Sequence, residues 1–192
     1  ALPLAGGANT LVRLNLKQVA LKAASIDDFF QQVLPYYGQL TFELIEARSA
    51  FLHQQSHFFD SFLVKEQLIE DRFAPMFGIY GMAEAVNILH ALSAKGLAAA
   101  IGSQEATDLS SNAYGHSQAA NELGLRISAA LANMVTSTPV TYGYKGRALL
   151  HSQSGISVDK DVTPGVRIPY GTEPDPISHI QALAKHHQYY TA

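Results

Sequence analysis

The chain has 192 residues, which is the length of one ordinary domain or of part of a larger one. It is 47% hydrophobic and only 15% charged, which excludes the charge-rich, apolar-poor composition of a disordered protein. Thirteen Lys and Arg against sixteen Asp and Glu give a net charge of −3, so no global positive field attracts nucleic acid or anionic lipid. No apolar run approaches the roughly 20 residues of a membrane span, and no signal-peptide pattern opens the sequence.

The sequence contains no cysteine, which excludes disulfides, thiolate metal sites and thiol nucleophiles within these residues. It begins at Ala1 without a methionine and stops at Ala192 without a polar tail. We therefore expect a single segment, residues 1–192, taken from a longer protein. A trimmed small domain is the alternative.

The first expected strand runs from residue 11 to residue 16, after a turn signal of two glycines at 6 and 7. Successive side chains of a strand point to opposite faces. One face therefore carries Leu11, Arg13 and Asn15, and the other carries Val12, Leu14 and Leu16. We expect a strand with one mixed face and one fully apolar face.

A long helix is expected to follow, beginning at the capping pair Ser25 and Asp28. Pro35 and Gly38 predict a kink or a split in it. The helix then resumes with an apolar stripe at helical spacing, made of Leu40, Leu44, Ala47 and Phe51.

The rest of the chain alternates strand and helix patterns. Residues 77–81 predict a short strand and tight turn, and a helix follows from residue 82 to about 96. A second long helix covers residues 116–134 and is stopped by Thr138 and Pro139. A strand at 148–150, with a polar end at 151–155, precedes a loop rich in Pro and Gly and a last helix over 177–186. The alternation predicts an α/β fold with parallel strands, in which ligands bind at the carboxyl ends of the strands.

Short motifs of known chemistry are mostly absent: there is no phosphate-binding glycine loop and no H-E-x-x-H. His53 and His57 have the i, i+4 spacing of two metal ligands, but no pattern places a third ligand near them, so a solvated face is the favoured interpretation. His186 and His187 are expected at the surface. We expect no metal site in the chain.

Arg13 is more informative because an unpaired charge in an apolar strand is costly. Two interpretations stay open: Arg13 lines a polar interior and binds substrate, or it pairs with a carboxylate such as Glu84. His151, Gln153 and Ser154 likewise either line a site or form a hydrogen-bonded strand end.

Several segments resemble glycyl radical enzymes. Residues 9–16, Asn-Thr-Leu-Val-Arg-Leu-Asn-Leu, resemble the strand after the active-site cysteine loop of anaerobic ribonucleotide reductases. Residues 76–85, Met-Phe-Gly-Ile-Tyr-Gly-Met-Ala-Glu-Ala, resemble the G-x-I-G-L-x-E element of that family. Residues 149–157 and 163–176 are similar to segments of the YjjI-type glycyl radical enzymes, which are related to pyruvate formate-lyase. The resemblance covers essentially the whole chain.

This resemblance implies the second half of a ten-stranded β/α barrel of the glycyl radical enzyme type. It implies an oxygen-sensitive, cytoplasmic enzyme of anaerobic metabolism whose backbone glycyl radical is installed by a separate radical S-adenosylmethionine activating enzyme. The radical oxidises a cysteine inside the barrel, and the resulting thiyl takes a hydrogen atom from a small-molecule substrate. We expect no directly bound cofactor, a homodimer when the protein is full length, and neither a nucleic-acid nor a membrane partner.

Two parts of that chemistry are missing from the sequence. The family's cysteine would lie upstream of Ala1 and its R-V-x-G-Y radical motif downstream of Ala192, and Arg126 is followed by Ile-Ser instead. We therefore expect no catalytic residue in this chain and no activity from it alone. The candidate substrate-binding residues are Asn9, Arg13, Asn15, His151, Gln153 and Ser154.

We expect four of these candidates to share one cavity wall. Arg13 would hold an anionic group, Asn15 and Gln153 would orient the substrate, and His151 would donate a hydrogen bond or shuttle a proton. A half-barrel would also expose sheet edges and self-associate. Two alternatives remain: a fragment of an anaerobic ribonucleotide reductase, although the chain offers no phosphate cradle, or a non-catalytic α/β binding domain.

Overall fold

The computed structural model describes residues 5–101, 113–152 and 162–190. At its centre is a parallel sheet in the order β1 (Gly7–Asn15), β2 (Phe73–Tyr80) and β3 (Leu149–Ser152). The predicted α/β class with parallel pairing is thus confirmed. The three described strands do not close a barrel, so the ten-stranded barrel stays a prediction.

Helices follow each of the first two strands, as parallel pairing requires. After β1 come α1 (Leu16–Ala20), α2 (Ile26–Asp28), the π-helix η1 (Phe29–Val33), α3 (Leu34–Gln54), α4 (Phe62–Gln67) and the turn η2 (Glu70–Arg72). After β2 come α5 (Met82–Ile101), α6 (Gln118–Ser137) and the turn η4 (Tyr144–Gly146). The chain ends, after β3, with α7 (Pro176–Ala184) and the turn η5 (Lys185–Gln188).

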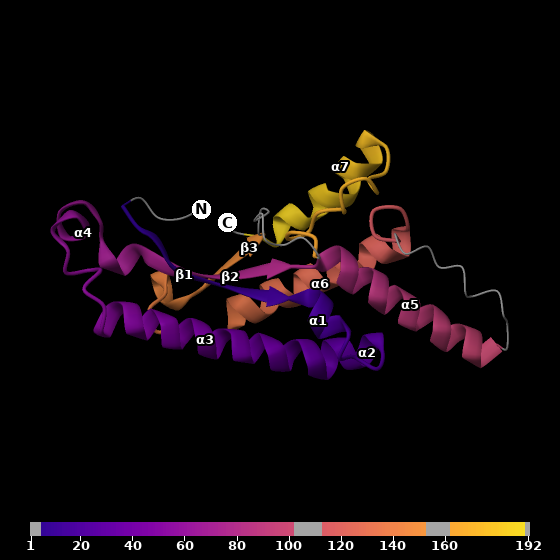
Figure 1. The fold of residues 1–192 in the computed structure, drawn as a ribbon, viewed down its shortest axis with the longest axis horizontal. Helices are drawn as coiled ribbons and strands as arrows, with labels where there is room; N and C mark the ends of the chain where they lie inside the picture. Colours follow the sequence, from indigo (N-terminus) through magenta and orange to yellow (C-terminus); the bar gives the residue numbers. More distant parts are fainter. Residues whose placement is uncertain (1–4, 102–112, 153–161, 191–192) are drawn as a thin grey trace.

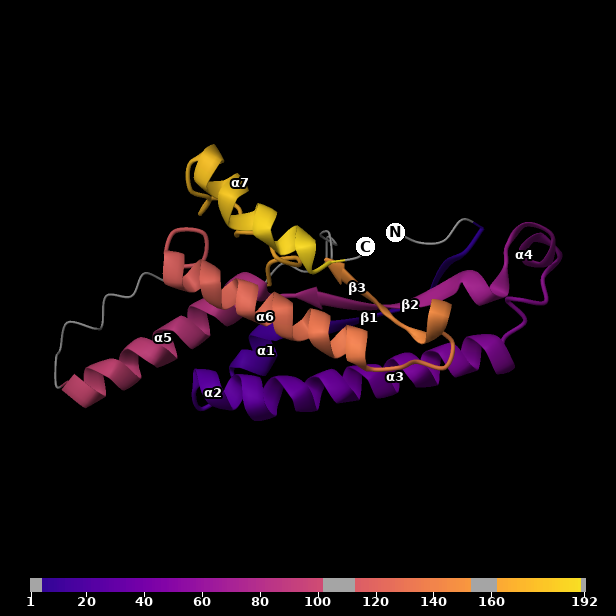
Figure 2. The ribbon, with the colours of Figure 1, turned by 180° about the vertical axis from the view of Figure 1, so that it is seen from behind.

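The sheet has one face covered by helices and a second face, which we call the open face, that no described helix covers. On this second face the middle strand is nevertheless buried at Ala74 and Met76. Helices α3 and α6 run along the same side of the strands, and α7 lies beside the first half of α6, near the carboxyl ends of the strands (Figures 1 and 2). Val12 and Leu14 of β1, Phe77 and Ile79 of β2 and Leu150 of β3 are all buried toward this helix layer. The apolar face predicted for the first strand is therefore the face that packs on the helices.

The long first helix runs from residue 26 to residue 54, and its α-helical hydrogen bonding is split just before Pro35, where a kink or a split is predicted. A π-helical turn, η1, comes immediately before Pro35, and the Leu34 amide bonds the Phe29 carbonyl five residues back. Pro35, the second residue of α3, directly follows this π-helical turn, so the hydrogen-bond pattern of the helix changes where the proline lacks its N–H. Gly38 has a packing role instead: a Cβ there would lie 2.2 Å from Sδ of Met134 on α6.

The apolar stripe predicted on this helix exists but faces outward. Leu40, Leu44 and Phe51 are 41%, 49% and 57% exposed. The buried side of α3 is a different set of residues: Leu34, Gly38, Thr41, Phe42, Ile45 and Ser49. Periodicity found the helix, but the apolar stripe does not mark its buried side.

The later elements match their predictions closely. Helix α6 begins at the N-cap Ser117 and ends at Thr138, next to the predicted stop. Asp175 caps α7 by accepting hydrogen bonds from the Ile177 and Ser178 amides. Across the described ranges, no helix is both long and apolar enough to cross a membrane.

Candidate functional site on the open face of the sheet

Three strands bring Arg13, Gly78 and His151 into one row across the sheet. Arg13 of β1 is paired in register with Gly78 of β2, which is in turn paired with His151 of β3. Residues that are paired in this way point to the same face. Because Val12, Phe77 and Leu150 face the helices, this row lies on the open face, so the predicted common face of Arg13 and His151 is observed. Their role in binding a substrate stays a prediction.

Gly78 makes room for the arginine. A Cβ at residue 78 would lie 2.9 Å from Cδ1 of Leu11 and 3.1 Å from Cγ of Arg13, which is too close for either contact to remain as it is. The guanidinium carbon of Arg13 lies 5.2 Å from the centroid of the Tyr80 ring, two residues further along the same face. The arginine side chain is thus directed toward the carboxyl end of β2.

His151 carries an unused hydrogen-bonding atom. Its Nδ1 is buried and has no hydrogen-bond partner, although the residue as a whole is only partly buried. Burial lowers the pKa of His151 because the imidazolium form loses hydration. A neutral imidazole with one free ring nitrogen can accept or donate a proton in a hydrogen bond to a ligand.

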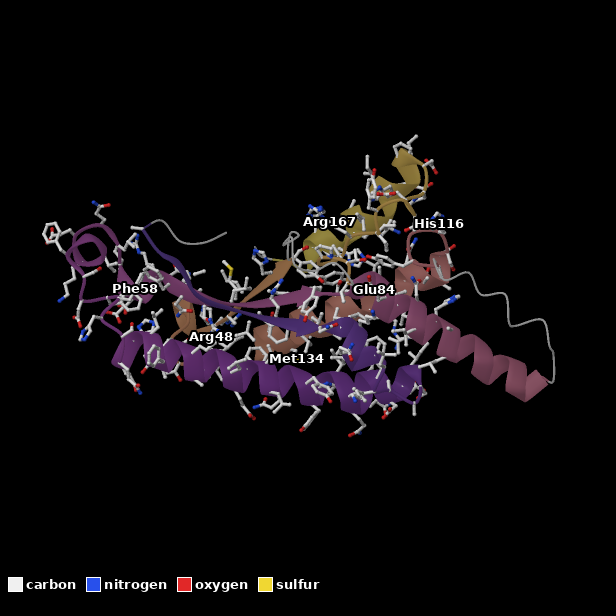
Figure 3. The ribbon with its side chains drawn as sticks, viewed as in Figure 1. Arg48, Phe58, Glu84, His116, Met134 and Arg167 are labelled. Carbon is white, nitrogen blue, oxygen red and sulfur yellow. The ribbon has the colours of Figure 1, made fainter. Side chains whose placement is uncertain are left out.

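The carboxyl end of β2 is held by the segment that follows β3. Gly81 has φ +82° and its amide donates to the Thr163 carbonyl at 2.7 Å. Glu84 Oε1 accepts hydrogen bonds from the backbone amide and the hydroxyl of Thr163, at 2.8 and 2.5 Å. Figure 3 shows Glu84 at the start of α5. Two segments that carry the family resemblance, 76–85 and 163–176, therefore meet beside the open face.

The bonds of Glu84 bear on the second interpretation of Arg13. Glu84 Oε1 accepts both of its hydrogen bonds from Thr163, and Glu84 Oε2 is buried without a hydrogen-bond partner. The described contacts of Glu84 are therefore with Thr163, and those of Arg13 include Tyr80. The expected Arg13–Glu84 pair is not among them.

The Asn15 side chain forms a hydrogen bond with the backbone at the start of α1. Its Oδ1 accepts a hydrogen bond from the Gln18 amide at 3.2 Å, which makes it the N-cap of α1. It shares the open face with Arg13 and pairs in register with Tyr80. Only its Nδ2 group remains to meet a substrate.

Asn9 does not join the open-face residues. The register of β1 and β2 shifts between Ala8 and Thr10, so Asn9 sits at a bulge. Its Nδ2 donates to the Tyr142 carbonyl at 2.8 Å and lies 3.4 Å from Nε2 of His53 on α3. Asn9 thus points to the helix layer and away from the wall predicted for Arg13, and its role in binding a substrate stays a prediction. Gln153 and Ser154 lie outside the described residues.

His53 is enclosed by aromatic rings and is not paired with His57. It stacks between Phe59 and Tyr142, with ring centroids at 4.4 and 4.5 Å, and its Nδ1 is 2.8 Å from a carboxylate oxygen of Glu70. His57 is 94% exposed. No group of three metal-binding side chains occurs in the part of the chain that the structure describes.

A cluster of buried, hydrogen-bonded polar side chains lies away from the open face. It includes His186, so the surface position expected for this residue is wrong. His186 is 1% exposed. Its Nδ1 is 2.7 Å from Ser128 Oγ and its Nε2 is 3.2 Å from Tyr114 Oη. Tyr114 donates to the Val166 carbonyl at 2.8 Å, and Tyr190 Oη is 3.1 Å from Ser128 Oγ.

Every polar group in this cluster has a hydrogen-bond partner if the imidazole of His186 is neutral. The Tyr114 hydroxyl donates its proton to the Val166 carbonyl, so its oxygen accepts a hydrogen bond from Nε2–H of His186. Nδ1 of His186 then accepts a hydrogen bond from the Ser128 hydroxyl. Burial, the main cause, and the nearby His187 lower the pKa of His186 to about 4. Burial also raises the pKa values of Tyr114 and Tyr190. The cluster is neutral and fully bonded, as expected of a structural element.

Sequence reasoning missed Gly78, Tyr80 and Thr163. A glycine inside a strand often marks a place where another group approaches closely, so Gly78 carried a usable signal. Thr163 carried none, because its bond to Glu84 spans 79 residues. The buried His186 had an indirect signal in Ser128, a polar residue on the apolar face of α6 that needed a partner.

Comparison with known proteins confirms the family that the sequence resembles. A family model described as "Glycyl radical enzyme YjjI-like" matches residues 1–192. The chain is 56% identical to "Uncharacterized protein YjjI" of Escherichia coli strain K12, over 99% of the chain and 34% of that protein. It is 32% identical to an "Uncharacterized protein" of Haemophilus influenzae strain Rd, over 99% of the chain and 35% of that protein. The chain therefore spans about a third of the length of these relatives.

Proposed function

The chain belongs to the YjjI-like glycyl radical enzyme family, and we propose that it supplies one wall of the substrate cavity in an oxygen-sensitive radical enzyme. The observation that carries the proposal is the row of Arg13, Gly78 and His151 on the open face of the sheet. Packing against apolar side chains would be destabilised by a guanidinium on this face. It would also be destabilised by a buried histidine ring nitrogen that has no hydrogen-bond partner.

Arg13 binds the substrate in this proposal. Its guanidinium is always charged and presents paired donors that match a carboxylate or a phosphate. Gly78 and Tyr80 fix its direction, the first by leaving space and the second by contact with the cation. The substrate is therefore a small molecule that carries an anionic group.

His151 holds or moves a proton next to that group. The lowered pKa keeps the imidazole neutral near pH 7, so it does not repel Arg13. Its buried Nδ1 is free to bond to a hydroxyl or carbonyl of the substrate. Asn15 contributes Nδ2 while its Oδ1 caps α1.

The radical chemistry belongs to the rest of the protein. This sequence contains no cysteine, so the thiyl that takes hydrogen from the substrate forms on a residue outside it. A radical S-adenosylmethionine activating enzyme installs the glycyl radical, and no cofactor binds this chain directly. We place the enzyme in the cytoplasm as a homodimer, with the sheet forming part of the second half of a ten-stranded β/α barrel.

The test uses the full-length protein that contains this chain, activated anaerobically, in wild-type and Arg13→Leu forms. Electron paramagnetic resonance measures the glycyl radical, and mass spectrometry follows the consumption of anionic compounds from a small-molecule extract. We expect Arg13→Leu to leave the radical yield unchanged and to abolish consumption, because the variant has no guanidinium to hold the anionic group, whereas the glycyl radical forms elsewhere in the protein.

Arg48→Leu is the matched control. Arg48 belongs to α3 and lies on the other side of β1 from the open face, where its Nε donates to Thr10 Oγ1 at 2.9 Å. We expect it to retain turnover per radical. Loss of the radical together with the fold in Arg13→Leu would make Arg13 structural, and unchanged consumption would refute the proposed binding role.

A further inference from the structure

The exposed apolar stripe on α3 has no structural explanation within the described residues. It consists of Tyr36, Leu40, Leu44, Ala47 and Phe51, which follow one another at intervals of three or four residues and so lie on one side of the helix. All five are exposed, and Tyr36 is 61% exposed. A continuous apolar stripe of this kind usually marks a surface that another segment covers.

The position of the stripe follows from the two neighbours of α3. On one flank, Gly38 packs against Met134 of α6, and α6 lies over the β3 side of the sheet. On the other flank, Ala47 and Phe51 border a hollow of about 340 Å³ together with Asn9 and Thr10 of β1. Figure 3 shows Arg48 between α3 and β1, at this flank. The stripe as a whole faces away from the sheet, and its carboxyl-terminal part, Ala47 and Phe51, borders the β1 side of the helix layer.

The β1 side is also where the described sheet stops. Its strand order is β1-β2-β3, so β1 is an edge strand, and it has nine residues. A long edge strand of a parallel sheet presents unpaired backbone groups and is normally paired or covered. The chain spans 34% and 35% of two relatives, so most of their length lies outside it.

We propose that the α3 stripe packs against a helix from the part of the same protein outside these 192 residues, belonging to a β/α unit whose strand pairs with the free edge of β1. The small side chain of Ala47 and the hollow beside it admit a large apolar side chain from that helix. The inference concerns the interface alone and does not depend on the reaction proposed above. A second copy of the chain is the competing occupant.

Photocrosslinking of the full-length protein tests this assignment. Phe51→p-benzoylphenylalanine keeps the aromatic ring and adds a benzoyl group, which the exposed position should tolerate, and Leu44→p-benzoylphenylalanine gives a second probe two stripe positions away. Irradiation followed by peptide mass spectrometry should give a crosslink within one molecule, to a peptide from outside residues 1–192. The yield should not depend on protein concentration.

The matched control is Gln39→p-benzoylphenylalanine, because Gln39 is exposed on α3 but lies off the stripe. We expect it to give at least fivefold less of that crosslink. A crosslinked dimer whose yield rises with concentration would assign the stripe to a second copy and overturn the proposal. Equal yields at Gln39 and Phe51, a crosslink confined to residues 1–192, or no crosslink at either stripe position would overturn it as well.

Discussion

Two histidines in this chain are shielded from water to the point that both have lowered pKa values, but their bonds differ. His186 has a partner on each ring nitrogen, in Ser128 and Tyr114. His151 has a buried Nδ1 without a partner. A pKa shift alone therefore does not mark a functional site, because structural burial produces the same shift. The unsatisfied atom, on a face without a helix layer, distinguishes the residue that can serve a ligand.

The largest expected effect separates the two histidines by function. His151→Leu removes a buried nitrogen that has no partner, so we expect an unchanged or higher melting temperature for the full-length protein. Turnover per glycyl radical should fall by about 100-fold or more, the range usual for loss of a positioned proton donor or acceptor. Calorimetry and the consumption assay measure the two quantities. A lower melting temperature with normal turnover would reverse the roles assigned to the histidines.

The pH dependence of stability sharpens the structural half of the comparison. Below pH about 6.5 an unfolded His186 takes up a proton, whereas the folded residue, with its pKa of about 4, does not. The free energy of unfolding should therefore fall as pH drops from 6.5 to 4, by about 3 kcal/mol in total from this residue. Denaturant unfolding at a series of pH values, compared with His186→Gln, isolates the contribution. Equal slopes in the two proteins would show that His186 titrates normally.

Removal of the structural histidine should have the opposite signature to removal of His151. His186→Leu leaves Ser128 and Tyr114 buried with fewer partners, which costs about 2 kcal/mol of unfolding free energy at pH 7. Turnover per glycyl radical should stay within about twofold of wild type, since His186 lies outside the open-face row. Chemical denaturation and the consumption assay measure both. A large loss of turnover at normal stability would place His186 in the functional site.

A smaller effect is expected from crowding the open-face row itself. In Gly78→Ala the new methyl group meets Leu11 and Arg13 at contact distances below those of ordinary packing. The flexible side chains can shift, so we expect turnover to drop only about tenfold, or about 1.4 kcal/mol, as Arg13 is displaced. Leu11→Ala in the same protein should restore part of the loss by returning space. No recovery in the double variant would mean that Gly78 acts through the backbone.

Much of the fold followed from local patterns in the sequence. The two-residue alternation of β1 placed Arg13 opposite the buried Val12 and Leu14, and the stop signal at Thr138 and Pro139 marked the end of α6 closely. Local rules failed where two solutions fit equally well. Helix α3 has two apolar sides, and only its neighbours decide which of them is buried.

The candidate site was predictable only in part, because long-range pairing decides it. The common face of Arg13 and His151 followed from the alternation of strands, and their shared row depended on the register set through Gly78. The bulge at Asn9 redirected a side chain that simple alternation placed with Arg13. The Thr163–Glu84 contact joins segments 79 residues apart, beyond the reach of any local pattern.

The most direct test of the central claim is a crystal structure of the full-length protein with a turnover substrate or an inactive analogue bound. The account predicts that the anionic group of the ligand lies within hydrogen-bond distance of the Arg13 guanidinium and that His151 Nδ1 contacts the same molecule. An open face filled by apolar side chains from another segment, with the ligand bound elsewhere, would contradict it.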